Sequence, residues 1–117
     1  MRGLVLEMLN SKAKARRRLS AFSAEKFTIL VNKALLAENL SFSTYALMME
    51  VYSHEEPPTL AAVALATGYS YWGVRNQVDR TPWFTKIQKQ LTRLTLTPEA
   101  HEKLARISRR IARYTFA

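Results

Sequence analysis

Along most of the chain, apolar residues recur at steps of three and four, the spacing that places them on one face of a helix. The first such stripe follows Ser23, a suitable N-cap, and predicts a helix over 23–38. Its apolar members are Phe27, Leu30, Val31, Ala34 and Leu35. We expect this face to be covered, either inside the monomer or by a second copy of the chain.

Three further helices follow. The first is expected to begin in the 41–44 region and to end at "EEPP", 55–58, because the residue before a proline is pushed out of the helical conformation. The next two, 59–68 and 70–81, are so closely joined that they predict a helix-turn-helix or a tight helical corner, and Pro82 ends the second. The residues expected to face inward are Leu47, Met48, Val51, Leu60, Val63, Ala64, Val74 and Val78.

The pattern changes at 83–96, where "WFTKIQKQLTRLTL" is aromatic, β-branched and partly alternating. This predicts two short strands that turn near "QKQ", 88–90. Thr97, Pro98 and Glu99 then form a strong helix start: an N-cap, a proline at the first helical position and an acid in the first turn. One face of this last helix is formed by Leu104, Ile107, Ile111 and Tyr114. The chain is therefore expected to be mainly α-helical with a small β-hairpin.

The length of 117 residues fits one domain. We expect a basic N-terminal arm or helix over 1–22 and a single domain over 23–117. The net charge of +9 is uneven, since the middle segment 21–68 is acidic and the segments on both sides are basic. A basic excess of this kind most often serves phosphate backbones, and the alternative is a solvated charged face.

Several kinds of chemistry find no support in the sequence. There is no cysteine, and His54 and His101 are too far apart to suggest a metal site. We recognise no nucleophile–base spacing, carboxylate pair or phosphate-binding loop, so we expect neither enzymatic activity nor a metal or cofactor. No segment approaches the ~18 apolar residues of a membrane span, and the first residues have the wrong charge order for a secretory signal. A cytoplasmic, nucleoid-associated protein is expected.

A family resemblance is carried by "LAAVALATGYSYWGVRNQVDR", 60–80, and by "LTLTPEA", 94–100. Ala64 and Gly68 stand at the small and the turn position of a helix-turn-helix. Over roughly 40–115 the chain resembles the winged-helix core of MarR-type transcriptional regulators. The resemblance implies a winged helix-turn-helix domain whose flanking N- and C-terminal helices are used for dimerisation.

Three residues depart from the pattern of that family. Gln77 occupies a position that is normally apolar, and Trp72 and Gly73 are unusual in a recognition helix. Gly73 is expected where either a phosphate or the neighbouring helix comes too close for a Cβ atom. The expected wing is also shorter than usual.

The recognition helix offers side chains suited to DNA. If Val74 and Val78 face the core, helical geometry turns outward Tyr71, Trp72, Arg75, Asn76 and Asp79. Arg75 is suited to guanine and Asn76 to adenine, the two commonest specific pairings in the major groove. For Asp79 we expect a salt bridge or a cap.

The aromatic residues of this helix have two interpretations. Tyr71 and Trp72 either pack as core, against Tyr69 or Trp83, or meet DNA, with the Tyr71 hydroxyl on phosphate and the Trp72 ring on thymine methyl groups. Further DNA-binding candidates on and around this helix are Ser70 and Arg80. Phosphate contacts are expected from the wing and, unless its arginines form a solvated face, from the N-terminal arm. These basic residues are Lys86, Lys89, Arg93, Arg16, Arg17 and Arg18.

Together these features predict a sequence-specific regulator of transcription that binds double-stranded DNA and represses as a homodimer on a palindromic operator. The family resemblance also implies a possible small-molecule effector, which the sequence does not identify. The apolar stripes over 23–38 and 98–115 would pair the two copies. The alternative is a winged-helix interaction module, or an accessory or anti-defence factor of a mobile element, that binds a protein or RNA. An exposed patch of Tyr71, Trp72 and Trp83 would favour that alternative.

Overall fold

The computed structural model describes residues 24–88 and 91–116, so the expected arm over 1–22 lies outside the described residues. The chain is helical over 24–37, and four helices and a hairpin follow. These are α2 (Phe42–Tyr52), α3 (Leu60–Thr67), α4 (Tyr71–Arg80), β1 (Phe84–Gln88), β2 (Thr92–Leu96) and α5 (Pro98–Phe116). The order of elements and the mainly α-helical class are confirmed.

Local capping sets the helix starts. Ser41, Thr59 and Ser70 are extended N-caps whose hydroxyl oxygens accept hydrogen bonds from main-chain N–H groups of α2, α3 and α4. Thr97 does the same for α5, 3.2 Å from the Ala100 nitrogen. Each cap satisfies a donor that the first turn of a helix leaves free. The predicted starts of these four helices are therefore confirmed with their physical cause.

The helix over 24–37 ends at an asparagine. Asn39 has a φ of 53°, and the Leu40 nitrogen donates to the Leu35 carbonyl at 2.9 Å. The Asn39 nitrogen donates to the Leu36 carbonyl at 3.2 Å. This pair of bonds is the Schellman closure of a helix end, and it turns the chain back toward α2.

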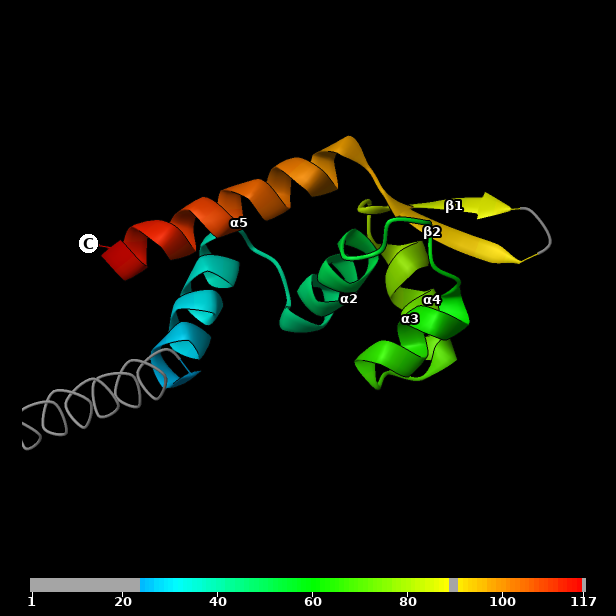
Figure 1. Ribbon diagram of the computed structural model, residues 1–117, viewed down its shortest axis with the longest axis horizontal. Coiled ribbons are helices and arrows are strands. Elements are labelled where there is room, and N and C mark those ends of the chain that lie inside the picture. Colours follow the sequence, from blue (N-terminus) through cyan, green and yellow to red (C-terminus); the bar gives the residue numbers. More distant parts are fainter. Residues whose placement is uncertain (1–23, 89–90, 117) are drawn as a thin grey trace, which may run out of the picture.

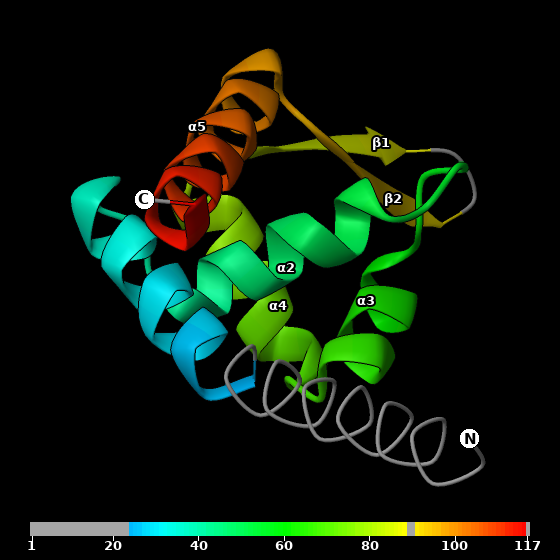
Figure 2. The same cartoon turned by 60° about the vertical axis from the view of Figure 1, so that its left-hand side comes forward.

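The interior consists of two apolar clusters that meet at α2. The first joins the helix 24–37 to α5 through Val31, Ala34, Leu35, Leu40, Met48, Ala100, Leu104 and Ile107. The second closes the helix-turn-helix through Leu47, Val51, Leu60, Val63, Ala64, Val74, Val78 and Leu94. Figures 1 and 2 show α2 running between the two parts, which we call the α5 lobe and the α4 lobe. Phe84 and Leu96 of the hairpin touch both clusters.

The first apolar stripe is divided between the interior and the surface. Val31, Ala34 and Leu35 are buried within the monomer, whereas Phe27 is 52% exposed. Thus the part of the stripe near Leu35 already has a cover in α5, and only the part near Phe27 remains for a second copy. Periodicity alone does not indicate where the covering element ends.

Candidate nucleic-acid interface

The helix-turn-helix is formed by α3, α4 and the turn between them. Gly68 ends α3 with a φ of 80°, a conformation that costs glycine little and other residues more. Val74 and Val78 are buried against α2 and α3, so the opposite side of α4 faces solvent. The antiparallel hairpin pairs Phe84 with Leu96 and projects beyond α3 and α4 (Figure 1).

The exposed side of α4 carries most of the expected side chains. Arg75, Asn76 and Arg80 are all exposed. Trp72 is 66% exposed and Tyr71 is 43% exposed, and their rings meet edge to face with centroids 5.9 Å apart. The interpretation of Trp72 as a core residue is therefore wrong, and Tyr71 is at most at the edge of the core.

Trp83 does not belong to the same patch. Its ring is half-buried against the first apolar cluster, and the Lys103 ammonium lies 5.3 Å from the ring centroid. The three-residue aromatic patch that would favour a protein or RNA partner is thus reduced to Tyr71 and Trp72. Beside them an open hollow of about 420 Å³ is lined by Ala61, Ala64, Leu65, Gly68, Tyr69 and Tyr71.

Arg75 rests on the ring of Trp72. The guanidinium carbon lies 5.4 Å from the ring centroid, within the range of a cation–π interaction. Among residues 24–88 and 91–116, Arg75 forms no ion pair. The guanidinium thus lies over the indole, and its N–H groups are suited to paired acceptors such as those of guanine.

At Gly73 the expected close approach of the neighbouring helix is not found among the described residues, and the expectation of a nearby phosphate stays a prediction. A Cβ atom at this position would lie 3.1 Å from the Ser70 hydroxyl oxygen, and no other atom of the described chain is close enough to oppose it. That hydroxyl accepts a hydrogen bond of 3.0 Å from the Gly73 nitrogen. A side chain at this position would require the Ser70 hydroxyl to shift by a few tenths of an ångström, and Ser70 itself is engaged in capping α4.

The polar side chain of Gln77, at a position that is normally apolar, is satisfied by hydrogen bonds to α2. The hydroxyl of the buried Thr44 donates to Gln77 Oε1 at 2.8 Å, and Gln77 Nε2 donates to the Ser43 hydroxyl at 3.3 Å. These bonds join α4 to α2, so they help to set the orientation of the recognition helix. Sequence reasoning missed this role because the partners lie more than thirty residues away.

Two basic residues of the wing already have partners within the protein. Lys86 forms an ion pair with Asp79, which confirms the expected salt bridge of Asp79. A hydrogen bond from Lys86 lowers the pKa of Asp79 below its ordinary value, and the positive charges of Lys86 and Arg75 act in the same direction. Arg93 donates through Nη1 to the Pro57 carbonyl at 2.8 Å, so its observed contact holds β2 to the segment before α3. The other expected phosphate contacts, Lys89 and the arginines Arg16, Arg17 and Arg18, lie outside the described residues.

A second charged site, missed by sequence reasoning, lies in the α5 lobe. The buried Glu38 carboxylate accepts hydrogen bonds from Arg106 Nε and Arg110 Nε, both at 2.8 Å. Hydrogen bonds from Arg106 and Arg110 hold the pKa of Glu38 below its ordinary value, although burial opposes this effect. Arg106 and Arg110 thus neutralise a buried carboxylate and join α5 to the end of the helix 24–37.

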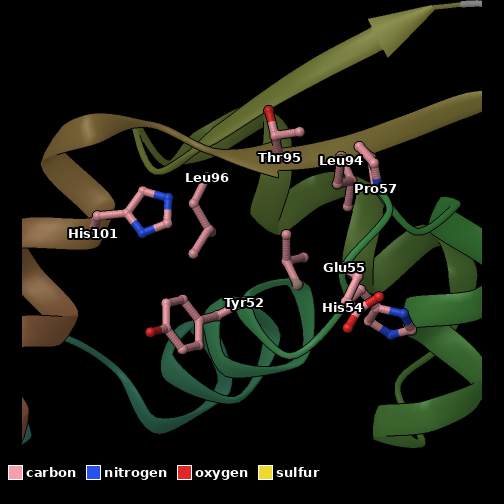
Figure 3. Close-up of a pocket in the computed structure, with 9 residues that line it drawn as sticks. Tyr52, His54, Glu55, Pro57, Leu94, Thr95, Leu96 and His101 are labelled. Carbon is pink, nitrogen blue, oxygen red and sulfur yellow. The ribbon is translucent and has the colours of Figure 1, made fainter.

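A small hollow lies where the two lobes meet. It has a volume of about 150 Å³ and lies between α2, β2 and the start of α5. Figure 3 shows Tyr52 and His101 facing each other at one end of this hollow, with His54 and Glu55 at the other. The Tyr52 and His101 rings meet edge to face with centroids 5.9 Å apart. A neighbouring hollow of about 200 Å³ between α2 and α5 shares both residues.

The described part of the chain contains neither a metal-binding cluster nor a membrane-spanning helix. No group of three or more histidine, aspartate or glutamate side chains in it is arranged to hold a metal ion. No helix in it combines the length and the apolar character needed to cross a membrane.

Comparison with solved structures identifies the architecture. The chain is similar to the transcriptional regulator Tm0710 from Thermotoga maritima, with a TM-score of 0.74 and 14% identity over 87% of this chain and 76% of that one. A MarR family protein from Bacillus stearothermophilus gives a TM-score of 0.71 and 10% identity over 91% and 78% of the two chains. The MarR of Staphylococcus aureus, in complex with salicylate and kanamycin, gives 0.65 and 18% over 96% and 73%.

These identities are low, and the similarity concerns the fold. No protein-family model matches the sequence, and no curated protein sequence is detectably similar to it. The chain has the winged helix-turn-helix fold of the MarR regulators, as the sequence resemblance implied. What the chain binds has to be argued from its own side chains.

Proposed function

We propose that the protein regulates transcription by binding double-stranded DNA at specific sequences through α4. The exposed side of α4 carries this proposal, because it presents Arg75 and Asn76 together on a rigid helix whose other side is buried. These are the two residue types best suited to read guanine and adenine in the major groove. The projecting hairpin beside α4 would follow the DNA backbone.

The regulator would act as a homodimer that represses by occupying a promoter. Ile29 and Leu36, two large apolar residues seven positions apart on one exposed side of the helix 24–37, support a second copy, and Phe27 of the first stripe is also exposed. A two-fold dimer places two recognition helices about one DNA turn apart and therefore favours a palindromic operator. DNA as the partner implies a cytoplasmic protein associated with the nucleoid.

Selection of short duplexes from a random pool, at two salt concentrations, tests the proposal. We expect a palindrome to be enriched and Arg75→Ala to relax the preference at one position in each half-site. Arg109→Ala is the matched control, since Arg109 is exposed on α5, away from the helix-turn-helix. Recovery of no motif, with binding that vanishes as salt rises, would reduce the function to general attraction of polyanions.

The alternative of a protein or RNA partner has its own outcome in this experiment. The exposed pair of Tyr71 and Trp72 is the observation that supports it. If the pool yields no motif, Trp72→Ala and Arg109→Ala are to be tested for binding to structured RNA. Binding of RNA that is lost with Trp72→Ala and retained with Arg109→Ala would replace the DNA proposal.

We also propose that a small molecule regulates DNA binding from the hollow between the lobes. Leu94 of the α4 lobe and His101 of α5 line it together with Tyr52 of α2, so an occupant would contact both lobes. Because the Staphylococcus aureus MarR was solved with salicylate, salicylate is the first probe. We expect it to weaken operator binding by the wild type and to have less effect on His101→Ala. An equal effect on both proteins would contradict this site.

A further inference from the structure

The exposed side of α4 changes its chemistry along the helix. The first turn presents Tyr71 and Trp72, and the next turn presents Arg75 and Asn76. Trp72 is two-thirds exposed, and its described contacts are an edge of Tyr71 and the guanidinium of Arg75. A ring placed in this way contributes little to the interior, so its large apolar surface is available to a partner.

The major groove contains one apolar group that fits such a ring. Base edges there present hydrogen-bond donors and acceptors, except for the 5-methyl group of thymine. The N-terminal residues of a recognition helix are the ones that approach the base edges. Trp72, in the first turn of α4, therefore stands where a thymine methyl group would be met.

Trp72 and Arg75 are also coupled to each other. They are three residues apart on one helix, and the guanidinium carbon lies 5.4 Å from the ring centroid. The acid nearest along the exposed side, Asp79, is paired with Lys86 and leaves Arg75 to the indole. This contact keeps the guanidinium over the indole, and its N–H groups suit the paired acceptors of a base.

Resting on the proposed function, we infer that Trp72 and Arg75 form one recognition unit for two neighbouring bases. The indole covers the methyl group of a thymine, and the guanidinium that it supports reads an adjacent guanine. The preferred ligand is thus a duplex whose half-sites contain a thymine beside a guanine. Removing the methyl group weakens binding at that thymine, and removing the indole weakens recognition of both bases.

Deoxyuridine substitution tests this unit without changing the base pairing. In the selected duplex, each thymine is replaced in turn by deoxyuridine, which lacks only the methyl group. We expect one position per half-site at which the wild type binds about three- to fivefold more weakly, the effect of one buried methyl group. With Trp72→Ala, the thymine and deoxyuridine duplexes should bind alike.

Two variants separate methyl recognition from a general loss of binding. Leu65→Ala removes an exposed apolar side chain of α3 that does not belong to this unit and should leave the ratio of thymine to deoxyuridine binding unchanged. Trp72→Ala should also reduce discrimination at the guanine read by Arg75, whereas Trp72→Phe should retain part of it, because a smaller ring still supports the guanidinium. Thermal unfolding should be similar for all of these variants, since the ring of Trp72 is exposed.

The outcomes distinguish this inference from the function on which it rests. Enrichment of a motif without thymine, or of one in which deoxyuridine has no effect at any position, overturns the recognition unit and leaves the DNA-binding function standing. A pool that yields no motif overturns both. A methyl effect that persists in Trp72→Ala also overturns the unit, because another side chain would then read the methyl group.

Discussion

Glu38 in the α5 lobe and Asp79 in the α4 lobe are two carboxylates with the same direction of pKa change and different surroundings. Hydrogen bonds from basic side chains lower the pKa of both. The Glu38 side chain is only 7% exposed, and it joins the end of one helix to α5. The Asp79 side chain is 44% exposed and belongs to the side of α4 that we assign to DNA.

The difference shows that an ion pair has to be judged by its burial and by what it joins. A buried carboxylate that loses its partners leaves an uncompensated charge, and this is costly. An exposed pair contributes little to stability because water and salt screen it. We therefore expect changes at Glu38 to act on folding and changes at Asp79 to act on binding.

Glu38→Gln should produce the largest effect on stability. Arg106 and Arg110 then lose their charged acceptor, and we expect a loss of about 2 kcal/mol in the free energy of unfolding. This value lies below the usual cost of breaking a buried pair because both arginine side chains are more than a third exposed. Urea unfolding measures it, and the exposed Glu56→Gln is the control. Equal stability of the two variants would refute a structural role for Glu38.

Lowering the pH should remove the stabilising contribution of the Glu38 carboxylate from the wild type. Since the pKa of Glu38 is lower in the folded than in the unfolded chain, its stabilising effect is complete above about pH 4.5 and is lost as the pH falls through the folded value. The difference in unfolding free energy between the wild type and Glu38→Gln should therefore shrink below pH 4.5. A difference that stays constant down to pH 3 would mean that the carboxylate charge is not the cause.

Two arginines of α5 provide a matched comparison with a smaller expected effect on the free energy of unfolding. Arg106 donates to Glu38 at 2.8 Å, whereas Arg109 is exposed and has no ion pair within the described residues. We expect Arg106→Ala to cost about 1 kcal/mol, because Arg110 continues to neutralise Glu38. Arg109→Ala should leave the free energy of unfolding nearly unchanged. Urea unfolding of both variants at pH 7 makes the test, and equal losses would contradict the assignment.

The elements of the fold could be predicted because their signals are local. Ser41, Thr59, Ser70 and Thr97 cap helices within three residues of themselves, and the predicted starts followed from them. The hairpin followed from alternation between Trp83 and Leu96 in the same way. Features of the candidate site that depend only on helical geometry, such as the exposure of Arg75, could be predicted from the sequence in the same way.

The remaining features depend on partners that are distant in the sequence. Glu38 is separated from its arginines by about seventy residues, and Gln77 lies more than thirty residues from Thr44. No periodicity connects such residues. Arg93 was expected on phosphate from its charge and its place on the wing, and the fold also gives it a bond to the distant Pro57 carbonyl. The sequence thus indicates which side chains are charged, and the fold decides which charges are left for a ligand.

Asp79→Asn should have a small effect, and mainly on DNA binding. It removes a negative charge from the proposed DNA-facing side and releases Lys86 for a phosphate. We expect affinity for any duplex to rise about threefold, the effect of one exposed charge near the backbone in moderate salt. The dependence of binding on salt should become steeper, because one more lysine contacts phosphate. Glu102→Gln on α5 makes the same change of charge in the other lobe and is the control. If both variants raise affinity equally, only net charge matters, and the Asp79–Lys86 pair has no particular position relative to DNA.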